Sequence, residues 1–302
     1  MTALPSPQQL RYLVALAEHG HFGRAATACA VTQSTLSAGI LALERQLDAP
    51  LLERTGGKRP VFTPLGRDLI GHAKAVLVAL QGCMEAVEAA RDPFGGPLRL
   101  GTLPTIGPFV LPRLLPRLRE GFPRLRLSLR EDGADRLLDA LDAARLDLLL
   151  LGLPCECGDA ETMILAEDPF SVALPAGHPL GRCEAVPRAA LAGERLILLE
   201  EGDGLREHAL SACGLPDGTG AADCTATSLQ MLVQMVAGGL GVTLLPRLAI
   251  AGGVTAGTDV AIRPVAGAFG VRRIGLAWRA GSPRAGEFRA LAPSIAAALP
   301  AL

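Results

Sequence analysis

The segment Gly20–Arg54, GHFGRAATACAVTQSTLSAGILALERQLDAPLLER, decides the fold of the first part of the chain. Gly20 is typical of a helix C-cap, and the alanine-rich residues 24–29 predict a short helix that packs closely on a neighbour. After a break at Ala30-Val31, Thr32 can cap a second helix. Apolar residues recur along that helix at spacings of four, three and four, which predicts one buried face: Leu36, Ile40, Leu43 and Leu47.

The buried face leaves polar side chains exposed at the start of the second helix, namely Gln33, Ser34, Thr35 and Ser37. Two helices joined by a tight turn, with amides and hydroxyls at the start of the second, are typical of a helix-turn-helix that enters the DNA major groove. Gln can form two hydrogen bonds with adenine, and Ser and Thr can bond base edges or phosphates. From periodicity alone, an alanine-rich helical hairpin with an ordinary polar surface is an equal alternative.

The residues that follow favour DNA binding. Asp48-Ala49-Pro50 ends the helix, and residues 51–54 and 61–63 predict two strands around a basic turn. Arg54, Lys58 and Arg59 would lie at the tip of this wing, where cations contact the sugar–phosphate backbone and give salt-dependent affinity without reading sequence. A solvated basic loop is the alternative, but its position directly after the helix pair favours the wing.

A first helix with an apolar stripe should support the recognition pair, and a long helix should follow the wing. Thr63-Pro64 is a typical helix start, and the helix is predicted to run to about Asp92. Its apolar residues form one continuous face: Leu65, Leu69, Ala73, Val76, Leu80, Cys83, Met84, Val87 and Ala90. Its own domain could cover this face, but a partner helix is favoured, because a symmetric dimer would bring two recognition helices to an interrupted palindrome.

Composition limits the class of protein. The chain has 302 residues, 49% of them hydrophobic, and a net charge of −1, so it has room for two or three domains and no global basic field. No signal peptide or membrane-spanning run is expected, which predicts a cytoplasmic protein. The seven cysteines are an odd, scattered set, which predicts mostly buried thiols rather than a disulfide framework. Cys155 and Cys157 have no second pair, so no metal is expected.

From Leu98 onward, short apolar strands alternate with helices, which predicts α/β architecture with largely parallel sheets. A crossing near Glu167-Asp168-Pro169 and a return near Gly267–Gly270 suggest two lobes with a ligand cleft between them. The groups Gly238–Gly241 and Gly218–Gly220 are interpreted as turns, because neither lies in the strand–turn–helix order of a phosphate site. No cofactor and no catalytic constellation is predicted.

The N-terminal residues resemble the LysR-type transcriptional regulators. The segments that carry the resemblance are Gln9–Tyr12, Phe22–Ala26, Val31–Ser37 and Leu43–Arg54. The resemblance implies a winged helix-turn-helix over residues 1–63, a linker and dimerisation helix over 64–92, and an effector domain over 93–302. That domain would resemble periplasmic binding proteins, with lobe I at about 97–166 and 268–302 and lobe II at about 167–267. The implied DNA contacts are Arg24, Thr32, Gln33, Ser34, Thr35, Ser37, Arg54, Lys58 and Arg59.

The rest of the chain resembles one branch of that family, the peroxide-sensing OxyR-like regulators. The matching segments are Leu100–Pro112, Leu198–Cys213, and Ala226–Leu229 through Leu244–Pro246. In that branch a reactive cysteine begins a helix in the motif G-H-C-L-R-D, and a resolving cysteine follows nine residues later. Here Cys213 matches the resolving position, Arg206 the arginine that activates a thiolate, and Thr105 a hydroxyl that holds peroxide.

Three positions depart from the branch's pattern. Gly204 stands at the reactive cysteine, Asp203 at its neighbouring histidine, and Ala134 at a second threonine. Without a thiol at residue 204, oxidation to a sulfenic acid and a disulfide cannot begin there. The sequence could be a cysteine-to-glycine variant, but three departures favour natural divergence. The sensor could instead bind a small molecule through Thr105, Asp203, Arg206, Thr227 and Ser228, or use other thiols such as Cys213 and Cys224.

We therefore predict a sequence-specific regulator that is not an enzyme. It would bind double-stranded DNA at an interrupted palindrome as a dimer or tetramer of identical chains, and it would respond to peroxide or a small molecule. The competing classes are a thiol redox enzyme with a DNA-binding appendage and a ligand-binding module whose N-terminal helices only assemble subunits. For Thr227-Ser228, a plain helix-capping role is an equal alternative.

Overall fold

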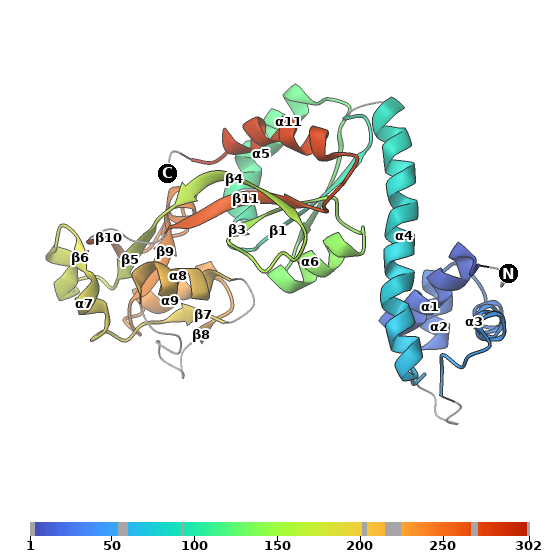
Figure 1. Cartoon of the computed structure of the whole chain (residues 1–302). Helices are drawn as coiled ribbons and strands as arrows, with labels where there is room; N and C mark the ends of the chain where they lie inside the picture. Colours follow the sequence, from blue (N-terminus) through green and yellow to red (C-terminus); the bar gives the residue numbers. More distant parts are fainter. Residues whose placement is uncertain are drawn as a thin grey trace. The chain divides into compact units, whose positions relative to one another are not determined.

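A computed structural model describes residues 4–53, 60–91, 94–200, 204–214, 225–266 and 271–300. The chain folds into two compact units, Met1–Val87 and Glu88–Leu302 (Figure 1). Within the described residues, no single helix is long and apolar enough to cross a membrane; only the bent pair Phe22–Ala28 and Gln33–Leu47 reaches that length and composition together.

The first unit begins with three helices, α1 (Pro7–His19), α2 (Phe22–Ala28) and α3 (Gln33–Leu47). Ser6 caps α1 reciprocally with Gln9, and Gly20 ends α1 in the left-handed conformation at φ 57°. The chain bends by 98° between α2 and α3, within the range of helix-turn-helix motifs. Thr32 caps α3 as the sequence predicts, since its side chain accepts a hydrogen bond from the Thr35 backbone N–H.

Apolar packing fixes the orientation of α3. Leu36, Ile40 and Leu43 are buried, whereas Leu47 is half-buried. Gly39 lies so close to the Tyr12 ring of α1 that an added Cβ would stand 2.5 Å from Tyr12 Cδ2. The close approach of α1 and α3 therefore depends on a residue without a side chain at position 39.

The predicted wing has two paired arms in the described residues. Leu52 and Phe62 form an antiparallel bridge, and Glu53 N donates to Val61 O over 2.8 Å. The Glu44 carboxylate of α3 accepts from the backbone N–H groups of Leu51 and Leu52, at 2.7 and 3.0 Å. These bonds tie the start of the wing to the recognition helix.

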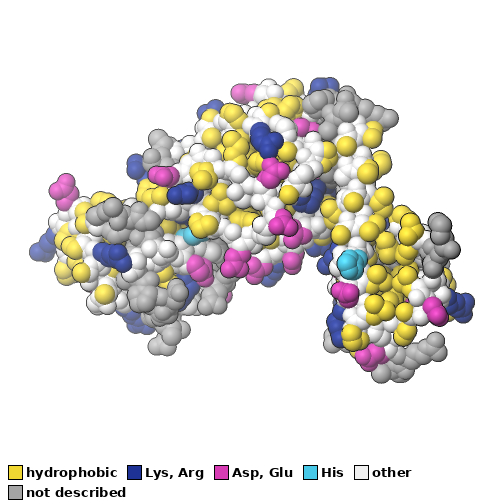
Figure 2. Space-filling view, viewed as in Figure 1, with side chains coloured by type: hydrophobic (Ala, Val, Ile, Leu, Met, Phe, Trp, Pro, Cys, Tyr) yellow, Lys and Arg dark blue, Asp and Glu magenta, His cyan; other side chains and the backbone are white. Residues whose placement is uncertain are grey.

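Helix α4 (Pro64–Arg91) starts at Thr63, whose Oγ1 accepts from Gly66 N over 3.0 Å. The sequence predicts that a partner helix covers one continuous apolar face of α4. This prediction is wrong for the first half of the helix, where Leu69, Ile70, Ala73 and Leu77 pack on the helices of their own unit. A second stripe stays exposed along the helix (Figure 2): Leu65, Val76, Leu80, Met84 and Val87.

The second unit contains a five-stranded sheet in the order β2-β1-β3-β11-β4. The strands are β1 (Pro97–Thr102), β2 (Arg126–Glu131), β3 (Leu148–Leu153), β4 (Glu161–Asp168) and β11 (Arg272–Trp278). Helices α5 (Gly107–Gly121) and α11 (Ala285–Ala296) lie on one face, and α6 (Ala134–Asp142) lies on the other (Figure 1).

A second sheet has the order β6-β10-β5-β9, beside the short pair β7-β8. The strands are β5 (Phe170–Leu174), β6 (Val186–Pro187), β7 (Leu198–Leu199), β8 (Thr225–Ala226), β9 (Thr243–Pro246) and β10 (Ala261–Ala266). Its helical segments are η1 (Pro179–Arg182), α7 (Arg188–Leu191), α8 (Leu205–Cys213), α9 (Leu229–Ala237) and α10 (Arg247–Ala251).

The two sheets belong to two lobes that the chain crosses twice, from β4 to β5 and from β10 back to β11. The prediction of largely parallel sheets is wrong, because β11 is antiparallel to both β3 and β4, and β5 is antiparallel to both β9 and β10. A chain that leaves a lobe by one strand and returns by the neighbouring strand runs in opposite directions in the two. The strands where the chain crosses between the lobes therefore form antiparallel pairs.

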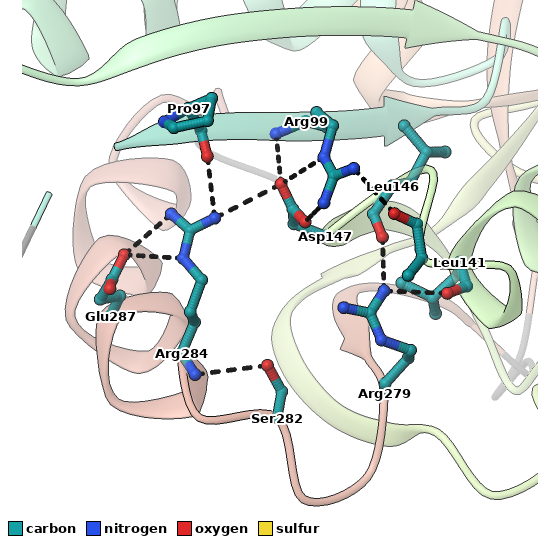
Figure 3. A network of polar contacts seen from close by, with 10 residues as sticks. Pro97, Arg99, Leu141, Leu146, Asp147, Arg279, Ser282, Arg284 and Glu287 are labelled. Atoms are coloured by element: carbon teal, nitrogen blue, oxygen red, sulfur yellow. Dashed lines mark hydrogen bonds and ion pairs between the residues drawn. The ribbon is translucent and has the colours of Figure 1, made fainter. Parts of the chain in front are cut away.

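Charged side chains anchor the first sheet at its start (Figure 3). The buried carboxylate of Asp147 accepts from Arg99 N over 2.8 Å and pairs with the Arg99 guanidinium. Arg284 pairs with Glu287 of α11 and donates to Pro97 O over 2.8 Å. Because buried carboxylates need partners, this network fixes β1 and α11 relative to each other.

Candidate DNA-reading helix and sensor pocket

The first turn of α3 presents the polar side chains that the sequence assigns to DNA. Gln33, Ser34, Thr35 and Ser37 are all exposed, while Leu36 between them is buried. Thr32 Oγ1 lies 2.9 Å from Ser34 Oγ and 2.7 Å from Thr35 Oγ1, so three hydroxyls form one cluster. This cluster orients hydroxyls at a helix N-terminus, where backbone N–H groups favour phosphate.

The other predicted DNA contacts divide between α2 and the wing. Arg24 is exposed on α2, and its Nη2 donates to His19 O over 2.7 Å. An added Cβ at Gly23 would stand 3.6 Å from Gln33 Oε1, which places Gln33 beside the start of α2. Arg54, Lys58 and Arg59 lie outside the described residues.

A pocket of about 390 Å³ in the second unit contains two of the positions that depart from the OxyR-like pattern, Ala134 and Gly204. Its other lining residues come from both lobes: Leu103, Asp135, Leu138, Leu151, Gly152, Pro154, Cys155, Glu156, Glu207 and His208. The pocket therefore lies where the sequence places an effector cleft.

Gly204 caps the N-terminus of α8 in the left-handed conformation, at φ 68°. An added Cβ would lie 3.8 Å from His208 Cε1, which is ordinary van der Waals contact. There is space for a side chain at residue 204, but the backbone there favours glycine.

His208 is a pocket residue that the sequence reasoning did not single out. Its Nε2 lies 3.0 Å from Pro154 O, which joins α8 in one lobe to the loop after β3 in the other. Burial lowers the pKa of His208, and the positive charge of Arg272 lowers it further. The neutral ring therefore donates Nε2–H to the carbonyl. The only sequence signal was its place one helical turn after Gly204.

Thr105 lies behind the pocket in a buried polar cluster. Its Oγ1 accepts from Arg272 Nη1 over 3.4 Å, and Arg272 forms a fully buried ion pair with Asp168. Asp168 Oδ1 also accepts from Leu248 N over 2.8 Å. Because Asp168 and Arg272 are opposite each other where the chain crosses between lobes, this pair fixes the hinge.

Three further candidate effector residues are described by the structure, and none of them lines the pocket. Arg206 is half-buried beside Leu198 and Thr243, Thr227 is exposed, and Ser228 Oγ accepts from Met231 N as the N-cap of α9. Asp203 and Cys224 lie outside the described residues, as does the side chain of Cys213. Among the described candidates, the structure therefore gathers Gly204 with Ala134 in the pocket, and Thr105 belongs to the buried polar cluster.

The cysteines differ from the prediction of mostly buried thiols. Cys155 and Cys157 form a disulfide, Cys83 is exposed, Cys183 is half-buried, and only Cys29 among the described free cysteines is buried. The first two follow the buried strand β3 in a surface loop, and Cys83 lies on an exposed helix face. Within the described residues, no group of three or more His, Cys, Asp or Glu could hold a metal ion.

Two family models match the chain. Residues 7–67 match the bacterial regulatory helix-turn-helix protein of the lysR family, and residues 91–299 match the LysR substrate binding domain. The first matched range lies in the first compact unit, and the second lies in the second compact unit.

Curated relatives match nearly the whole chain. A probable hydrogen peroxide-inducible genes activator of Streptomyces viridosporus is 42% identical over 98% of this chain and 95% of its own length. The DNA-binding transcriptional dual regulator OxyR of Escherichia coli is 39% identical over 96% of this chain and 94% of its own length.

Solved structures agree with the sequence matches. A full-length OxyR variant of Pseudomonas aeruginosa is 34% identical with a TM-score of 0.76, covering 97% of this chain and 95% of that one. A peroxide-bound OxyR mutant of Corynebacterium glutamicum is 32% identical with a TM-score of 0.66, covering 99% of this chain and 94% of that one.

Proposed function

The chain belongs to the lysR family of bacterial regulatory helix-turn-helix proteins, and on that premise we propose that the first turn of α3 reads base edges in the DNA major groove. It is a LysR-type transcriptional regulator that resembles OxyR peroxide-responsive activators, not an enzyme. The observation that supports α3 as the reader is the exposure of Gln33, Ser34 and Thr35 on a helix whose opposite face buries Leu36, Ile40 and Leu43.

The base-reading role falls on Gln33, because its amide offers both a donor and an acceptor to adenine. The hydroxyl cluster of Thr32, Ser34 and Thr35 contacts phosphates or base edges. Arg24 and the wing residues Arg54, Lys58 and Arg59 add contacts to the sugar–phosphate backbone, which give affinity without sequence preference.

The operator is an interrupted palindrome bound by two copies of the chain. The exposed stripe on α4 supports this arrangement, because a row of apolar side chains on a 28-residue helix needs a partner of similar length. A symmetric pair presents two α3 helices to two half-sites. Two such dimers form a tetramer through the effector domains, as the family resemblance implies.

The sensor has changed from the thiol chemistry of the OxyR-like pattern at residue 204. Gly204 carries no sulfur, and Ala134 in the same pocket carries no hydroxyl. A small molecule that binds in the pocket is the second candidate effector, and the volume of about 390 Å³ favours a compact one. Reporter transcription with and without peroxide, in the natural chain and in Gly204→Cys, separates the two effectors.

DNA titrations of Gln33→Ala test the reading role. The probes are a duplex enriched from a random pool by the full-length protein and an unselected duplex, each titrated at several salt concentrations. We expect Gln33→Ala to lose roughly 1–3 kcal/mol on the selected duplex and little on the other. Gln230→Ala, an exposed glutamine on α9, is the control and should change neither. Equal losses on both duplexes would refute base reading by Gln33.

A further inference from the structure

Two cysteines line or flank the sensor pocket although neither occupies the reactive position of the OxyR-like pattern. Cys155 and Cys157 are half-buried in the loop after β3, and their sulfur atoms are bonded. Their Cα atoms are 5.2 Å apart, within the range that a disulfide requires. The loop can therefore hold both sulfurs within bonding reach, and both are accessible enough to meet small reagents.

The position of this loop connects it to the other lobe. Cys155 lines the pocket together with Gly204 and His208 of α8. The residue before Cys155 is Pro154, whose carbonyl is the hydrogen-bond partner of His208 Nε2 at 3.0 Å. A change in the backbone at Cys155 would therefore alter the hydrogen bond between Pro154 and His208, which joins the two lobes.

The charge of the pocket limits what reacts there. Its described lining residues include the carboxylates Asp135, Glu156 and Glu207 and no Lys or Arg. Negative charge repels anionic reagents such as glutathione disulfide. A small neutral oxidant enters without this electrostatic cost.

We propose that Cys155 and Cys157 form a reversible dithiol–disulfide switch that a hydroperoxide oxidises in this pocket, and that its redox state controls the contact between His208 and Pro154. The coupling to DNA rests on the proposed function, whereas the chemistry at the two cysteines does not.

The reaction balances in two steps. The sulfur of one cysteine attacks the peroxide; an S–O bond forms, the O–O bond breaks, the sulfur loses two electrons and the peroxide leaves as an alcohol or water. The thiol of the other cysteine then attacks the sulfenic sulfur; an S–S bond forms, the S–O bond breaks and water leaves. Two equivalents of a small thiol, themselves oxidised to a disulfide, restore both thiols.

Mass spectrometry of the full-length protein tests the chemistry directly. Trypsin should release residues 146–182 as one peptide, since no Lys or Arg lies between Arg145 and Arg182, and Cys155 and Cys157 are its only cysteines. The protein is reduced with dithiothreitol, freed of it, and exposed to hydrogen peroxide or to glutathione disulfide at the same concentration. We expect peroxide to remove two hydrogen atoms from this peptide over minutes to hours, and dithiothreitol to restore them.

Hydrogen exchange in α8 tests the coupling between lobes. We expect residues 205–210 to differ in exchange between reduced and peroxide-treated protein, and the difference to vanish in the Cys155→Ser/Cys157→Ser double variant. Cys183→Ser is the matched control, because Cys183 is half-buried, free and outside the pocket lining. That variant should behave as the natural chain does.

DNA binding is measured on the same samples with the duplex selected from a random pool. A footprint that changes with peroxide in the natural chain and in Cys183→Ser, but not in the double variant, supports the switch. If the mass of peptide 146–182 does not change with peroxide, the proposed switch is overturned. If glutathione disulfide oxidises the peptide as much as peroxide does, the assignment of the oxidant is overturned. Unchanged α8 exchange overturns the coupling. Absence of DNA binding in both redox states would overturn the proposed function. The mass measurement would still test the chemistry at the two cysteines, because it does not depend on DNA.

Discussion

The backbone conformation of residue 204 favours glycine, and the residue carries no thiol. The left-handed φ of 68° is unfavourable for any other residue by about 1 kcal/mol. We expect Gly204→Cys and Gly204→Ala to lower the free energy of unfolding equally, by about that amount, in urea titrations. Only Gly204→Cys should add a thiol that iodoacetamide labels at the N-terminus of α8. A Gly204→Ala protein as stable as the natural chain would contradict the left-handed conformation.

His208 should make the stability of the second unit depend on pH. Its pKa in the folded state is below the ordinary value of 6.5, so the unfolded chain binds a proton more readily. The stability that the neutral ring contributes is full above pH 6.5 and is lost as pH falls through the lowered pKa. We expect the His208→Gln protein to lose less stability than the natural chain when the pH is lowered from 7.5. Thermal unfolding measures the change.

Carboxylates also titrate during such an acidification, so the comparison needs a control. His72→Gln changes an exposed histidine on α4 and should leave the pH dependence of the natural chain unaltered. A His208→Gln protein with the same pH dependence as the natural chain would mean that the neutral ring is not favoured by folding.

The sensor residues show how far sequence reasoning reaches at this scale. The resemblance identified Gly204 and Ala134 as departures, and the structure places both in one pocket. Cys155 and His208 were not assigned to the site, because their proximity arises from the packing of a loop on a helix more than 50 residues later. Periodicity reports which face of an element is buried, and it carries no information on which distant element covers that face.

At the scale of elements, the packing of α1 on α3 depends on Gly39. A Cβ there would stand 2.5 and 2.7 Å from two carbon atoms of the Tyr12 ring, so the helices must separate or the ring must move. Overpacking of this kind costs about 1–3 kcal/mol. We expect Gly39→Ala to be destabilised by that amount in urea titrations and to weaken DNA binding, because α3 carries the proposed reading residues.

The matched control for Gly39→Ala is Gly71→Ala in the same compact unit. Gly71 is exposed on α4 and has nothing within 4 Å of an added Cβ. Alanine should stabilise this helix by about 0.5–1 kcal/mol through its better helix propensity. A Gly39→Ala protein that gains stability as Gly71→Ala does would contradict the close approach of α1 and α3.

Helices with a capping residue were predicted well, whereas α11 was missed. The helix start at Thr32 and the start at Thr63-Pro64 agree with the structure, because caps and a 3.6-residue period are local signals. The sequence reasoning missed β4, an edge strand with half-buried and exposed residues in near alternation, and β10, which contains Pro264. Proline in an apolar run argues against a strand, and only the tertiary pairing with β5 overrides it.

For the whole molecule, local placement of charge and apolar surface matters more than composition. The net charge is −1, so DNA affinity cannot come from a general basic field. In the dimer that we propose, a few local contacts are repeated in two copies, and linking two weak sites raises affinity steeply. The exposed stripe on α4 is the surface that we propose for holding the copies together.

Substitution of Leu80 by glutamate tests this proposal. Leu80 is 42% exposed in the single chain and lies in the stripe with Val76 and Met84. Burying the exposed 42% of Leu80 in both copies contributes roughly 1–3 kcal/mol, and a glutamate in its place adds the cost of burying an unpaired charge. We expect Leu80→Glu to weaken self-association at least about a hundredfold, since each 1.4 kcal/mol is a factor of ten. Sedimentation equilibrium at several concentrations measures the change.

Lys74→Glu is the control, because Lys74 is exposed on α4 outside the stripe and receives the same carboxylate side chain. On DNA, Leu80→Glu should bind a single half-site with the affinity of the natural chain, yet lose the added affinity for two half-sites on one duplex. Lys74→Glu should keep that added affinity. Because the half-site measurement reports on a single DNA-binding unit, a Leu80→Glu protein that binds the full palindrome as tightly as the natural chain would show that α4 does not join the copies.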